Sequence, residues 1–387
     1  MYVIKDSVHG NIKLTDLELE LLDSREMQRL RGIKQLALTN LVYPGANHTR
    51  FEHSLGTVHL TGEMCESMDL SEMDEKELRI AALLHDVGHG AFSHESEYFL
   101  KKHLGETHES IAEGKIRSNG IAGPLKKAGV DPARISSLLK GEGLGVLITS
   151  GVGSDRMDYL LRDSYYTGVA YGVIDSERLI HTMSLSKGDI VLEEGGFEAA
   201  ESLLLARFMM FSTVYSHHAV RIASAMLRRA IELGIESGAL RPVDLASLDD
   251  FGVLKTLLSN PKAGRFVRDI ENRELFKRAF VYEWNSLQGK SRKVLEKNGG
   301  ARTLAKEIAA SIDVAEDDVL VDVPTQQYKE AGDVLVDLES GMRKLTHASD
   351  LVSSIKAAEE KRQRLIVACP QGLVKRVEKA AREKLGI

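Results

Sequence analysis

A histidine–aspartate pair, His85-Asp86, ends an apolar run of the chain and is well suited to bind a metal ion. Its imidazole nitrogen and its carboxylate oxygen can both bind one divalent cation. Alone the pair is weak evidence, because this dipeptide occurs by chance in many proteins. Two distant segments supply the same donor types, His53 upstream and Asp155 downstream. These four side chains are therefore predicted to form one hydrolytic metal centre.

The positions of these four residues limit where a metal can bind. His85 and Asp86 are neighbours, so on a regular helix their side chains would point in different directions. We expect them to share one ion only where the helix ends, and Gly88 permits that ending. Asp155 follows Ser154, which can cap a helix, so the helix dipole would favour the ionised carboxylate. Four side chains from different helices must therefore converge on one point.

The donor types also limit the metal and its chemistry. Imidazole and carboxylate ligands suit Zn, Fe, Mn, Ni or Co and are less typical of Ca. An open coordination position would hold water and lower its pKa, which yields a nucleophile at neutral pH. For any single residue, the simpler interpretation is a core histidine or a capping acid. The four together, in this order and with these flanks, favour one divalent transition metal.

Composition limits the class of protein. The chain has 387 residues and 43% hydrophobic content, which suggests two or three units. Its net charge of -6 gives no overall positive field, so no nucleic-acid partner is expected and an anionic substrate would need local positive charge. Cys65 and Cys369 are too few for a disulfide framework. With no signal-type apolar run and no stretch near the ~18 apolar residues of a membrane helix, we expect a soluble cytoplasmic protein.

Hydrophobic periodicity predicts a mainly α-helical body. Residues 3–14 alternate around His9-Gly10 and predict a hairpin, and Thr15 to Glu18 predicts a capping box before the next helix. Asp74 is the predicted cap of the helix that ends near the metal pair. Helices are expected over residues 25–38, 51–68, 75–85, 95–104, 108–117, 155–163 and 197–233.

The pattern changes toward the C-terminus, where short apolar strands alternate with helices. Strands are predicted at 319–323, 334–338 and 364–369, with helices at 350–362 and 371–385, and a further strand pair at 187–196. The C-terminal elements predict one small sheet appended to the helical body. The expected domains are a core over residues 1–240, a helical extension over 241–300 and a small α/β region over 301–387.

Short motifs follow one another in order over residues 1–220. They are Asp6-Ser-Val-His-Gly10, Gln28-Arg-Leu-Arg31, Lys34-Gln-Leu36, Tyr43-Pro-Gly-Ala46, Arg50-Phe-Glu-His-Ser-Leu-Gly56, His85-Asp-Val-Gly-His-Gly-Ala-Phe-Ser-His94, Thr107-His-Glu109 and Asp155-Arg-Met-Asp-Tyr-Leu-Leu-Arg-Asp163. In these motifs the chain resembles the HD-domain deoxynucleoside triphosphate triphosphohydrolases. The resemblance implies a mainly α fold, with an HD-domain helical core and a small C-terminal α/β appendage.

The resemblance also implies roles for individual residues. It implies that His53, His85, Asp86 and Asp155 bind the metal. It places five residues near the scissile phosphate, including an acid that orients a catalytic histidine and a histidine that donates a proton: His89, His94, Glu97, His108 and Glu109. It gives phosphate or sugar contacts to Gln35, Leu36, Arg50, Arg156, Tyr159, Asp163, Arg207 and Tyr215. Taken singly, the histidines could satisfy buried backbone groups, Arg207 could be solvated and Tyr215 could belong to the core.

An activity and partners follow from the same resemblance. Water would attack the α-phosphorus of a deoxynucleoside triphosphate and release the deoxynucleoside and intact triphosphate. A second ion, Mg, would lie on the β- and γ-phosphates. Some relatives bind an activating guanine nucleotide between subunits, and Asp23, Gln28 and Arg31 match its ligands, although a capped, salt-bridged helix explains them equally well. The resemblance thus implies a nucleotide substrate and a homodimer or homotetramer.

Two other functions remain open from the sequence. An HD phosphatase acting on nucleoside mono- or diphosphates, such as guanine nucleotides, would use the same metal and histidines. A catalytically silent HD module that binds nucleotides or nucleic acid would need no complete ligand set. Identification of the products would distinguish the phosphatase from a triphosphohydrolase. Salt-dependent binding of nucleic acid without turnover would favour the silent module.

Overall fold

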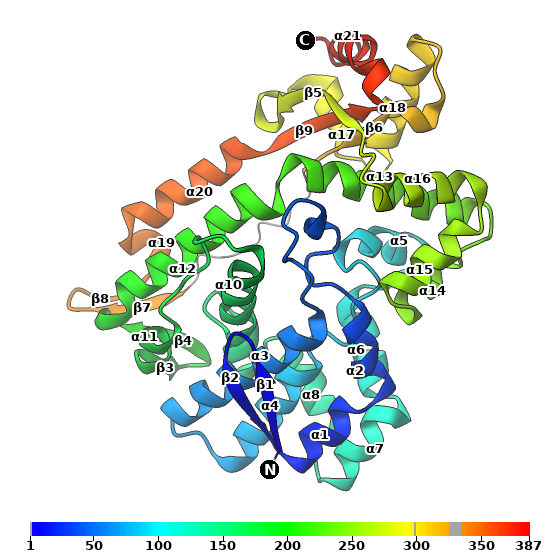
Figure 1. The fold of residues 1–387 in the computed structure, drawn as a ribbon. Coiled ribbons are helices and arrows are strands. Elements are labelled where there is room, and N and C mark those ends of the chain that lie inside the picture. Colours follow the sequence, from blue (N-terminus) through cyan, green and yellow to red (C-terminus); the bar gives the residue numbers. More distant parts are fainter. Residues whose placement is uncertain (1, 298, 325–333) are drawn as a thin grey trace. The chain divides into compact units, whose positions relative to one another are not determined.

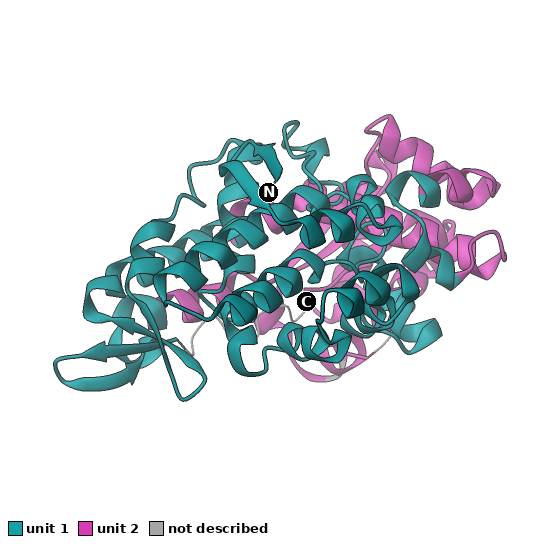
Figure 2. Ribbon diagram, turned by 90° about the horizontal axis from the view of Figure 1, so that it is seen from below, with its two compact units in different colours: residues 1–211, 242–253, 330–353 teal, residues 212–241, 254–329, 354–387 magenta. Residues whose placement is uncertain are grey.

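The computed structural model describes residues 2–297, 299–324 and 334–387, and the chain divides into two units (Figures 1 and 2). Unit 1 comprises residues 1–211, 242–253 and 330–353, and unit 2 comprises residues 212–241, 254–329 and 354–387. Helices dominate both units, which confirms the predicted mainly α fold with small sheets. Within the described ranges, no helix is both long enough and apolar enough to cross a bilayer.

Unit 1 begins with the predicted hairpin. Strands β1 (Tyr2–Asp6) and β2 (Gly10–Leu14) pair antiparallel. Gly10 has a φ of +73°, a conformation that glycine adopts at little cost, and it closes the turn. Helix α1 (Asp16–Leu22) follows with the predicted capping box, in which the Thr15 and Glu18 side chains each bind the other residue's backbone N–H.

The segment after α2 (Arg25–Arg29) is not the long helix that was predicted to reach residue 38. The chain passes through a 3-10 turn and then bonds to distant partners. The Lys34 N–H donates to Asp250 Oδ2 at 3.0 Å, and the Gln35 N–H donates to the His48 carbonyl at 3.0 Å. These tertiary hydrogen bonds replace the helical ones, which periodicity alone could not predict.

Three packed helices form the centre of unit 1 (Figure 1). Helix α3 (Arg50–Ser67) lies against α4 (Glu72–Leu84) and α10 (Ser154–Thr167). Although α3 carries polar residues, it is buried on most of its circumference, as a helix surrounded by other elements must be. Polar side chains on α3 are therefore held inside the unit.

Two predicted caps lie at other residues. Ser71, rather than Asp74, caps α4, because the Ser71 hydroxyl accepts the Asp74 N–H at 3.2 Å. Gly153, rather than Ser154, is the cap position of α10. The buried Ser154 hydroxyl instead accepts a hydrogen bond from Thr61 on α3 at 2.7 Å. Both helices nevertheless begin within a few residues of the predicted positions.

The turn that follows α4 depends on Gly88, but for a reason other than the one predicted. Helix α4 ends at Leu84, and the next four residues form a turn. Gly88 is not among the residues with positive φ. A Cβ at this position would overlap the His108 carbonyl and the backbone of helix α6 (His108–Ile116). Glycine is therefore needed for close packing, which brings α6 against the turn.

The remaining helices of unit 1 surround this centre. Helix α5 packs against α14, and α6 packs against α7 and α8. The predicted helical region over residues 197–233 is interrupted by a π-helical turn at Phe211–Tyr215. The helices are α5 (His94–Leu104), α6 (His108–Ile116), α7 (Asn119–Lys127), α8 (Pro132–Leu139), α9 (Val146–Thr149), α11 (Ser176–His181), α12 (Phe197–Met210), α14 (Pro242–Ser247) and α19 (Leu345–Ala348).

The prediction of a single C-terminal sheet is wrong, because the predicted strands belong to two different sheets. In unit 1, β7 pairs in parallel with β4 and antiparallel with β8, in the order β3-β4-β7-β8. In unit 2, β9 (Arg364–Cys369) lies between β5 (Lys277–Glu283) and β6 (Leu320–Asp322), antiparallel to both. Strand partners distant in sequence decide this arrangement. The unit 1 strands are β3 (Met183–Ser186), β4 (Asp189–Glu193), β7 (Leu335–Leu338) and β8 (Gly341–Lys344).

Unit 2 has its own core, in which α18 and α21 pack against the three-stranded sheet. Helix α13 packs against α16 in the same unit. Helices α15 (Asp250–Leu258) and α20 (Asp350–Arg362) start in unit 1 and continue into unit 2. The other elements are α13 (His218–Glu236), α16 (Pro261–Glu271), β5 (Lys277–Glu283), α17 (Gly289–Leu295), α18 (Gly300–Ser311), β6 (Leu320–Asp322), β9 (Arg364–Cys369) and α21 (Val374–Leu385).

Candidate metal centre and active site

Two imidazole rings meet at the centre of unit 1. His53 lies in the first turn of α3 and His85 follows the last residue of α4, and their Nε2 atoms are 3.1 Å apart. The other nitrogen of each ring faces an acceptor: His85 Nδ1 donates to the Ala82 carbonyl and His53 Nδ1 donates to Asp158, each at 2.7 Å. In the neutral rings both Nε2 lone pairs therefore face the same point, and they repel unless a cation lies between them.

Two carboxylates face the same point. Asp155 Oδ1 is 3.0 Å from His53 Nε2 and 3.7 Å from His85 Nε2, and Asp86 Oδ1 is 3.4 Å from His85 Nε2. Donor atoms about 2.1 Å from a common ion lie roughly 3–4 Å from one another, so this spacing fits one divalent metal. Asp155 occupies the first turn of α10, where the helix dipole favours a carboxylate.

The electrostatics of this point favour positive charge. Burial alone would lower the pKa of His53, but the hydrogen bonds to Asp155 and Asp158 raise it to about 10. The same carboxylates can stabilise a metal ion in place of the imidazolium proton. Among the described residues, the donor atoms of His53, His85 and Asp86 lie close enough together to hold one metal ion, and Asp155 is the predicted fourth ligand.

Arg50 supports the centre from the side. Its Nη1 donates to Asp86 Oδ2 at 2.6 Å and its Nε donates to the Ser93 hydroxyl at 2.7 Å. Burial raises the pKa of Asp86, but Arg50 and the neighbouring histidines outweigh this and hold it well below the usual range. Arg50 therefore keeps Asp86 ionised, and it also lines the cavity beside the metal site.

A row of three histidines lies next to the metal site. The ring of His89 stacks on that of His108 with centroids 4.3 Å apart, and His94 meets His89 edge-on at 5.4 Å. Glu97 binds two of them: one oxygen is 2.7 Å from His108 Nδ1 and the other is 3.2 Å from His94 Nδ1. Glu109 Oε1 lies 3.3 Å from His108 Nε2. The five predicted catalytic residues thus form one contiguous group.

His108 and Glu97 shift each other's pKa in opposite directions. Burial alone would lower the pKa of His108, but its hydrogen bond to the Glu97 carboxylate raises it above the ordinary value. The hydrogen bonds from His108 and His94 in turn lower the pKa of Glu97. His108 is therefore suited to carry a proton at neutral pH, and Glu97 to remain ionised beneath it.

A cavity of about 400 Å³ joins the metal site to the histidine row. Its far wall is formed by α6, α8 and α9 and includes the apolar side chains of Ile116, Leu139 and Ile148. Volumes of about 300–1,000 Å³ are usual for small-molecule sites. The predicted residues that line the cavity are Gln35, Arg50, His53, His85, Asp86, His89, His94, His108, Glu109, Asp155 and Tyr159.

Several predicted substrate residues do not line this cavity. Arg156 donates to the Gly151 carbonyl at 3.3 Å, and the buried Asp163 binds His48 at 2.7 Å. The guanidinium of Arg207 lies over the Phe211 ring, 4.8 Å from its centroid. Two further residues lie elsewhere along the chain: Leu36 follows Gln35 after α2, and Tyr215 ends the π-helical turn in unit 2. A substrate role for these residues remains a prediction.

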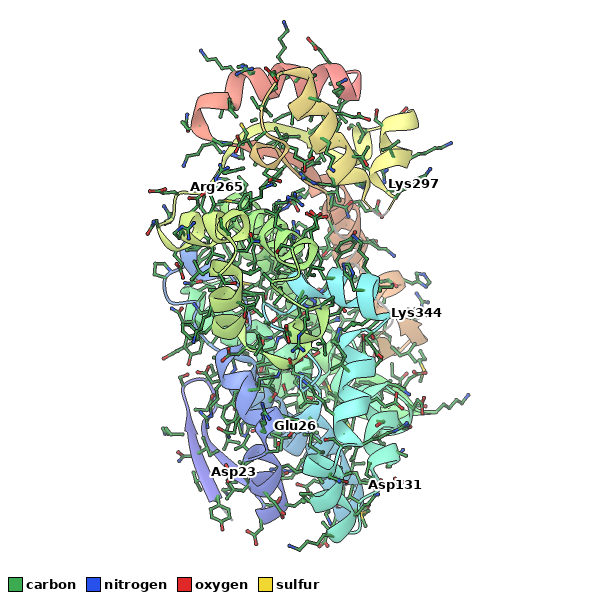
Figure 3. All side chains as sticks on the ribbon, turned by 90° about the vertical axis from the view of Figure 1, so that its right-hand side faces the viewer. Asp23, Glu26, Asp131, Arg265, Lys297 and Lys344 are labelled. Atoms are coloured by element: carbon green, nitrogen blue, oxygen red, sulfur yellow. The ribbon has the colours of Figure 1, made fainter. Side chains whose placement is uncertain are left out.

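The three residues predicted to bind a regulatory nucleotide lie around α2. Asp23 is exposed on the surface (Figure 3). Gln28 donates to the Leu22 carbonyl at 2.9 Å and accepts from Arg31 Nε at 2.9 Å, and the Arg31 guanidinium covers the Phe51 ring. Gln28 and Arg31 thus already have protein partners, as expected for residues that stabilise a helix end.

Sequence reasoning missed the residues that support the metal ligands. Asp158 contacts His53, and His9 contacts Asp158 at 2.6 Å. Both lie inside the quoted motifs, three residues after Asp155 and three residues after Asp6, so the signal was present without a role attached to it. Their function depends on which helices pack together, which the motifs do not reveal.

Comparisons with known proteins agree with the geometry. Residues 50–136 match the HD domain family, and residues 174–387 match a family described as the HD-associated region. An uncharacterized protein of Methanocaldococcus jannaschii is 36% identical over 380 residues, which cover 97% of this chain and 80% of that protein. Human deoxynucleoside triphosphate triphosphohydrolase is 27% identical over 401 residues, which cover 85% of this chain and 63% of that enzyme.

A solved structure has the same fold. The crystal structure of a phosphohydrolase from Bacteroides thetaiotaomicron superposes with a TM-score of 0.75 and 25% identity, and the match covers 96% of this chain and 99% of that one. The chain spans less than two thirds of the human relative's length but nearly all of this bacterial chain. The similarity therefore includes both the helical core and the HD-associated region.

Proposed function

We propose that this chain, which belongs to the HD-domain phosphohydrolases, hydrolyses deoxynucleoside triphosphates to a deoxynucleoside and triphosphate. One observation carries the proposal: the four metal-binding side chains and the histidine row that contains His108 open into one cavity. Such a cavity can hold a phosphate between a Lewis acid and a proton donor. The matching human relative is named for this reaction.

The metal centre would activate the phosphate. A divalent metal, one of Zn, Fe, Mn, Ni or Co, would polarise a phosphate oxygen and supply a nucleophile from water when bound by His53, His85, Asp86 and Asp155. Arg50 adds a fixed positive charge at the cavity wall, where it can offset the charge of the phosphate chain. Mg would accompany the β- and γ-phosphates as part of the substrate.

The histidine row would handle the proton. Cleavage of the bond between the α-phosphorus and the 5′-oxygen leaves an alkoxide, which needs a proton as it departs. His108 would donate this proton, because the Glu97 carboxylate both fixes its Nδ1 and raises the pKa of the ring. His89, stacked on His108, would border the same phosphate.

Gln35 supports a substrate with a sugar hydroxyl. Its side-chain oxygen is buried and has no hydrogen-bond partner among the residues that the structure describes. A buried acceptor left unpaired costs free energy, of about 1–3 kcal/mol in typical cases. Since Gln35 also lines the cavity, we propose that its amide group contacts a hydroxyl of the bound nucleotide after a small rotation of the side chain. We propose that Tyr159, which also lines the cavity, makes a further contact to the phosphate or the sugar.

A nucleotide panel tests the function. Metal analysis of the purified full chain, followed by dNTPs, NTPs, NDPs and NMPs with chromatographic identification of products, should give deoxynucleoside and intact triphosphate in equal amounts. Inorganic phosphate as the first product would instead establish a phosphatase of mono- or diphosphates. Binding without any turnover would leave a silent nucleotide-binding module.

The same panel tests regulation. We propose that the chain assembles as a homodimer or homotetramer and that a guanine nucleotide bound near Asp23, Gln28 and Arg31 increases its activity. Turnover and oligomer mass should then both be higher in the presence of GTP or dGTP than in its absence. Unchanged values would remove the regulatory role and leave the hydrolytic one.

A further inference from the structure

The orientation of His53 is set by a second carboxylate that does not face the metal. His53 Nδ1 is 2.7 Å from Asp158 Oδ2, and both side chains are almost completely buried. Because a carboxylate only accepts hydrogen bonds, His53 must carry its proton on Nδ1. Nε2, which faces His85 and Asp155, is then the nitrogen whose proton a metal ion would displace, and its lone pair would bind the ion.

The Asp158 carboxylate is itself held on all sides. Arg162 donates to it twice, from Nε to Oδ2 at 2.9 Å and from Nη2 to Oδ1 at 3.0 Å. His9 Nε2 lies 2.6 Å from Oδ1. Together with His53, these contacts occupy both oxygens, so the carboxylate cannot rotate without breaking a buried hydrogen bond.

The sequence spacing makes this contact possible. Asp155 and Asp158 are three residues apart on α10 and therefore lie on one face of the helix. Asp155 faces the metal site, and Asp158 faces Nδ1 of His53. Gly56 lies three residues after His53 on α3. A Cβ at Gly56 would overlap the carboxylate of Asp158 and the guanidinium of Arg162. The glycine thus allows α10 to reach the ligand.

His9 connects this carboxylate to the N-terminal hairpin. The turn that carries His9 is fixed by Asp6, whose Oδ1 accepts the backbone N–H of Val8 and of His9 at 2.9 Å each. Asp6 also accepts two hydrogen bonds from Arg162, at 2.9 and 3.2 Å. The hairpin is therefore joined to the metal centre by buried polar contacts and not by apolar packing alone.

We propose that Asp158 and His9 are positioning residues of the metal centre, which hold the His53 ring so that its Nε2 lone pair faces the ion. The inference rests on the proposed metal site. A carboxylate behind a metal-binding histidine raises the basicity of the ring and fixes its orientation, and loss of such a partner typically weakens metal binding about 10- to 100-fold. A buried salt bridge with a purely structural role would not act on metal affinity in this way.

Cobalt binding tests the proposal without any substrate. The full-length protein is freed of metal and titrated with Co²⁺ against a chelator, and the visible absorption of the bound ion reports its ligand geometry. Asp158→Asn should weaken binding about 10- to 100-fold and change the spectrum. His9→Ala should act in the same direction, and His9→Gln, whose amide can donate to Asp158, should restore most of the affinity.

A matched control separates positioning from general destabilisation. Asp322→Asn also removes the charge of a buried carboxylate paired with two arginines, Arg221 and Arg228, and should leave the cobalt affinity unchanged. Wild-type affinity and spectrum in folded Asp158→Asn would overturn the inference. If Asp158→Asn does not fold, the cobalt affinity and spectrum of His9→Ala decide whether the inference holds. If the wild type does not bind cobalt, the metal site itself is refuted. If the variants bind cobalt more weakly but the wild type hydrolyses no dNTP, only the proposed reaction is refuted.

Discussion

His85→Ala and Asp86→Ala should each lower turnover by about 10³-fold or more and leave the purified protein without stoichiometric metal. The metal is expected to supply several kcal/mol of transition-state stabilisation, and each 1.4 kcal/mol corresponds to about a tenfold change in rate. The His85→Ala substitution removes the Nε2 atom that lies beside Nε2 of His53, and with it one predicted metal ligand. Steady-state kinetics and elemental analysis of the same samples measure both effects.

The control for this prediction is another histidine. His103→Ala changes an exposed histidine of α5 and should leave metal content and turnover unchanged. Because Asp86 also pairs with the buried Arg50, the unfolding temperature of Asp86→Ala should be recorded with its activity. Full turnover with one bound metal per chain in either variant would show that the centre is misassigned.

His108→Ala should lower kcat by about 10²- to 10⁴-fold and leave metal content intact, because general acid catalysis typically contributes that much. The ring is the member of the histidine row whose pKa is raised above the ordinary value by the Glu97 carboxylate, after burial has acted in the opposite direction. It can therefore hold the proton that the leaving 5′-oxygen requires. Single-turnover kinetics separate this loss from slower product release.

The companion variant Glu97→Gln assigns the role of His108. An acid with a raised pKa is active below that pKa, and its contribution is lost as the pH rises through it. Removal of the Glu97 charge lowers the pKa of His108, so the alkaline limb of the kcat/KM profile should shift to lower pH. Glu66→Gln, on the exposed side of α3, should not shift the profile. An unchanged alkaline limb in Glu97→Gln would exclude His108 as the donor.

The residues that converge at the centre could be named from the sequence because their chemistry is local. His85, Asp86 and the histidines that follow lie within one short motif, and few other residue types could replace them as metal ligands. The helices that carry them were also predictable, since α3, α5 and α6 begin and end within a residue or so of the predicted bounds. Periodicity and capping determine such helices within their own sequence.

What could not be predicted depends on distant partners. Asp158 supports His53 only because α10 packs on α3 at Gly56, and no pattern within α10 encodes that contact. The helix expected to continue to residue 38 ends early because Asp250 binds the backbone of Lys34. The C-terminal strands were assigned to one sheet because β-pattern indicates a strand but not its partner. Tertiary pairing decided all three.

Hydrolysis of a dNTP in ¹⁸O-labelled water tests the central claim most directly, since the label marks the atom that water attacked. Attack at the α-phosphorus, beside the metal site and His108, predicts one ¹⁸O in the released triphosphate and none in the deoxynucleoside. Label in inorganic phosphate, or in the 5′-hydroxyl of the nucleoside, would contradict the proposed reaction.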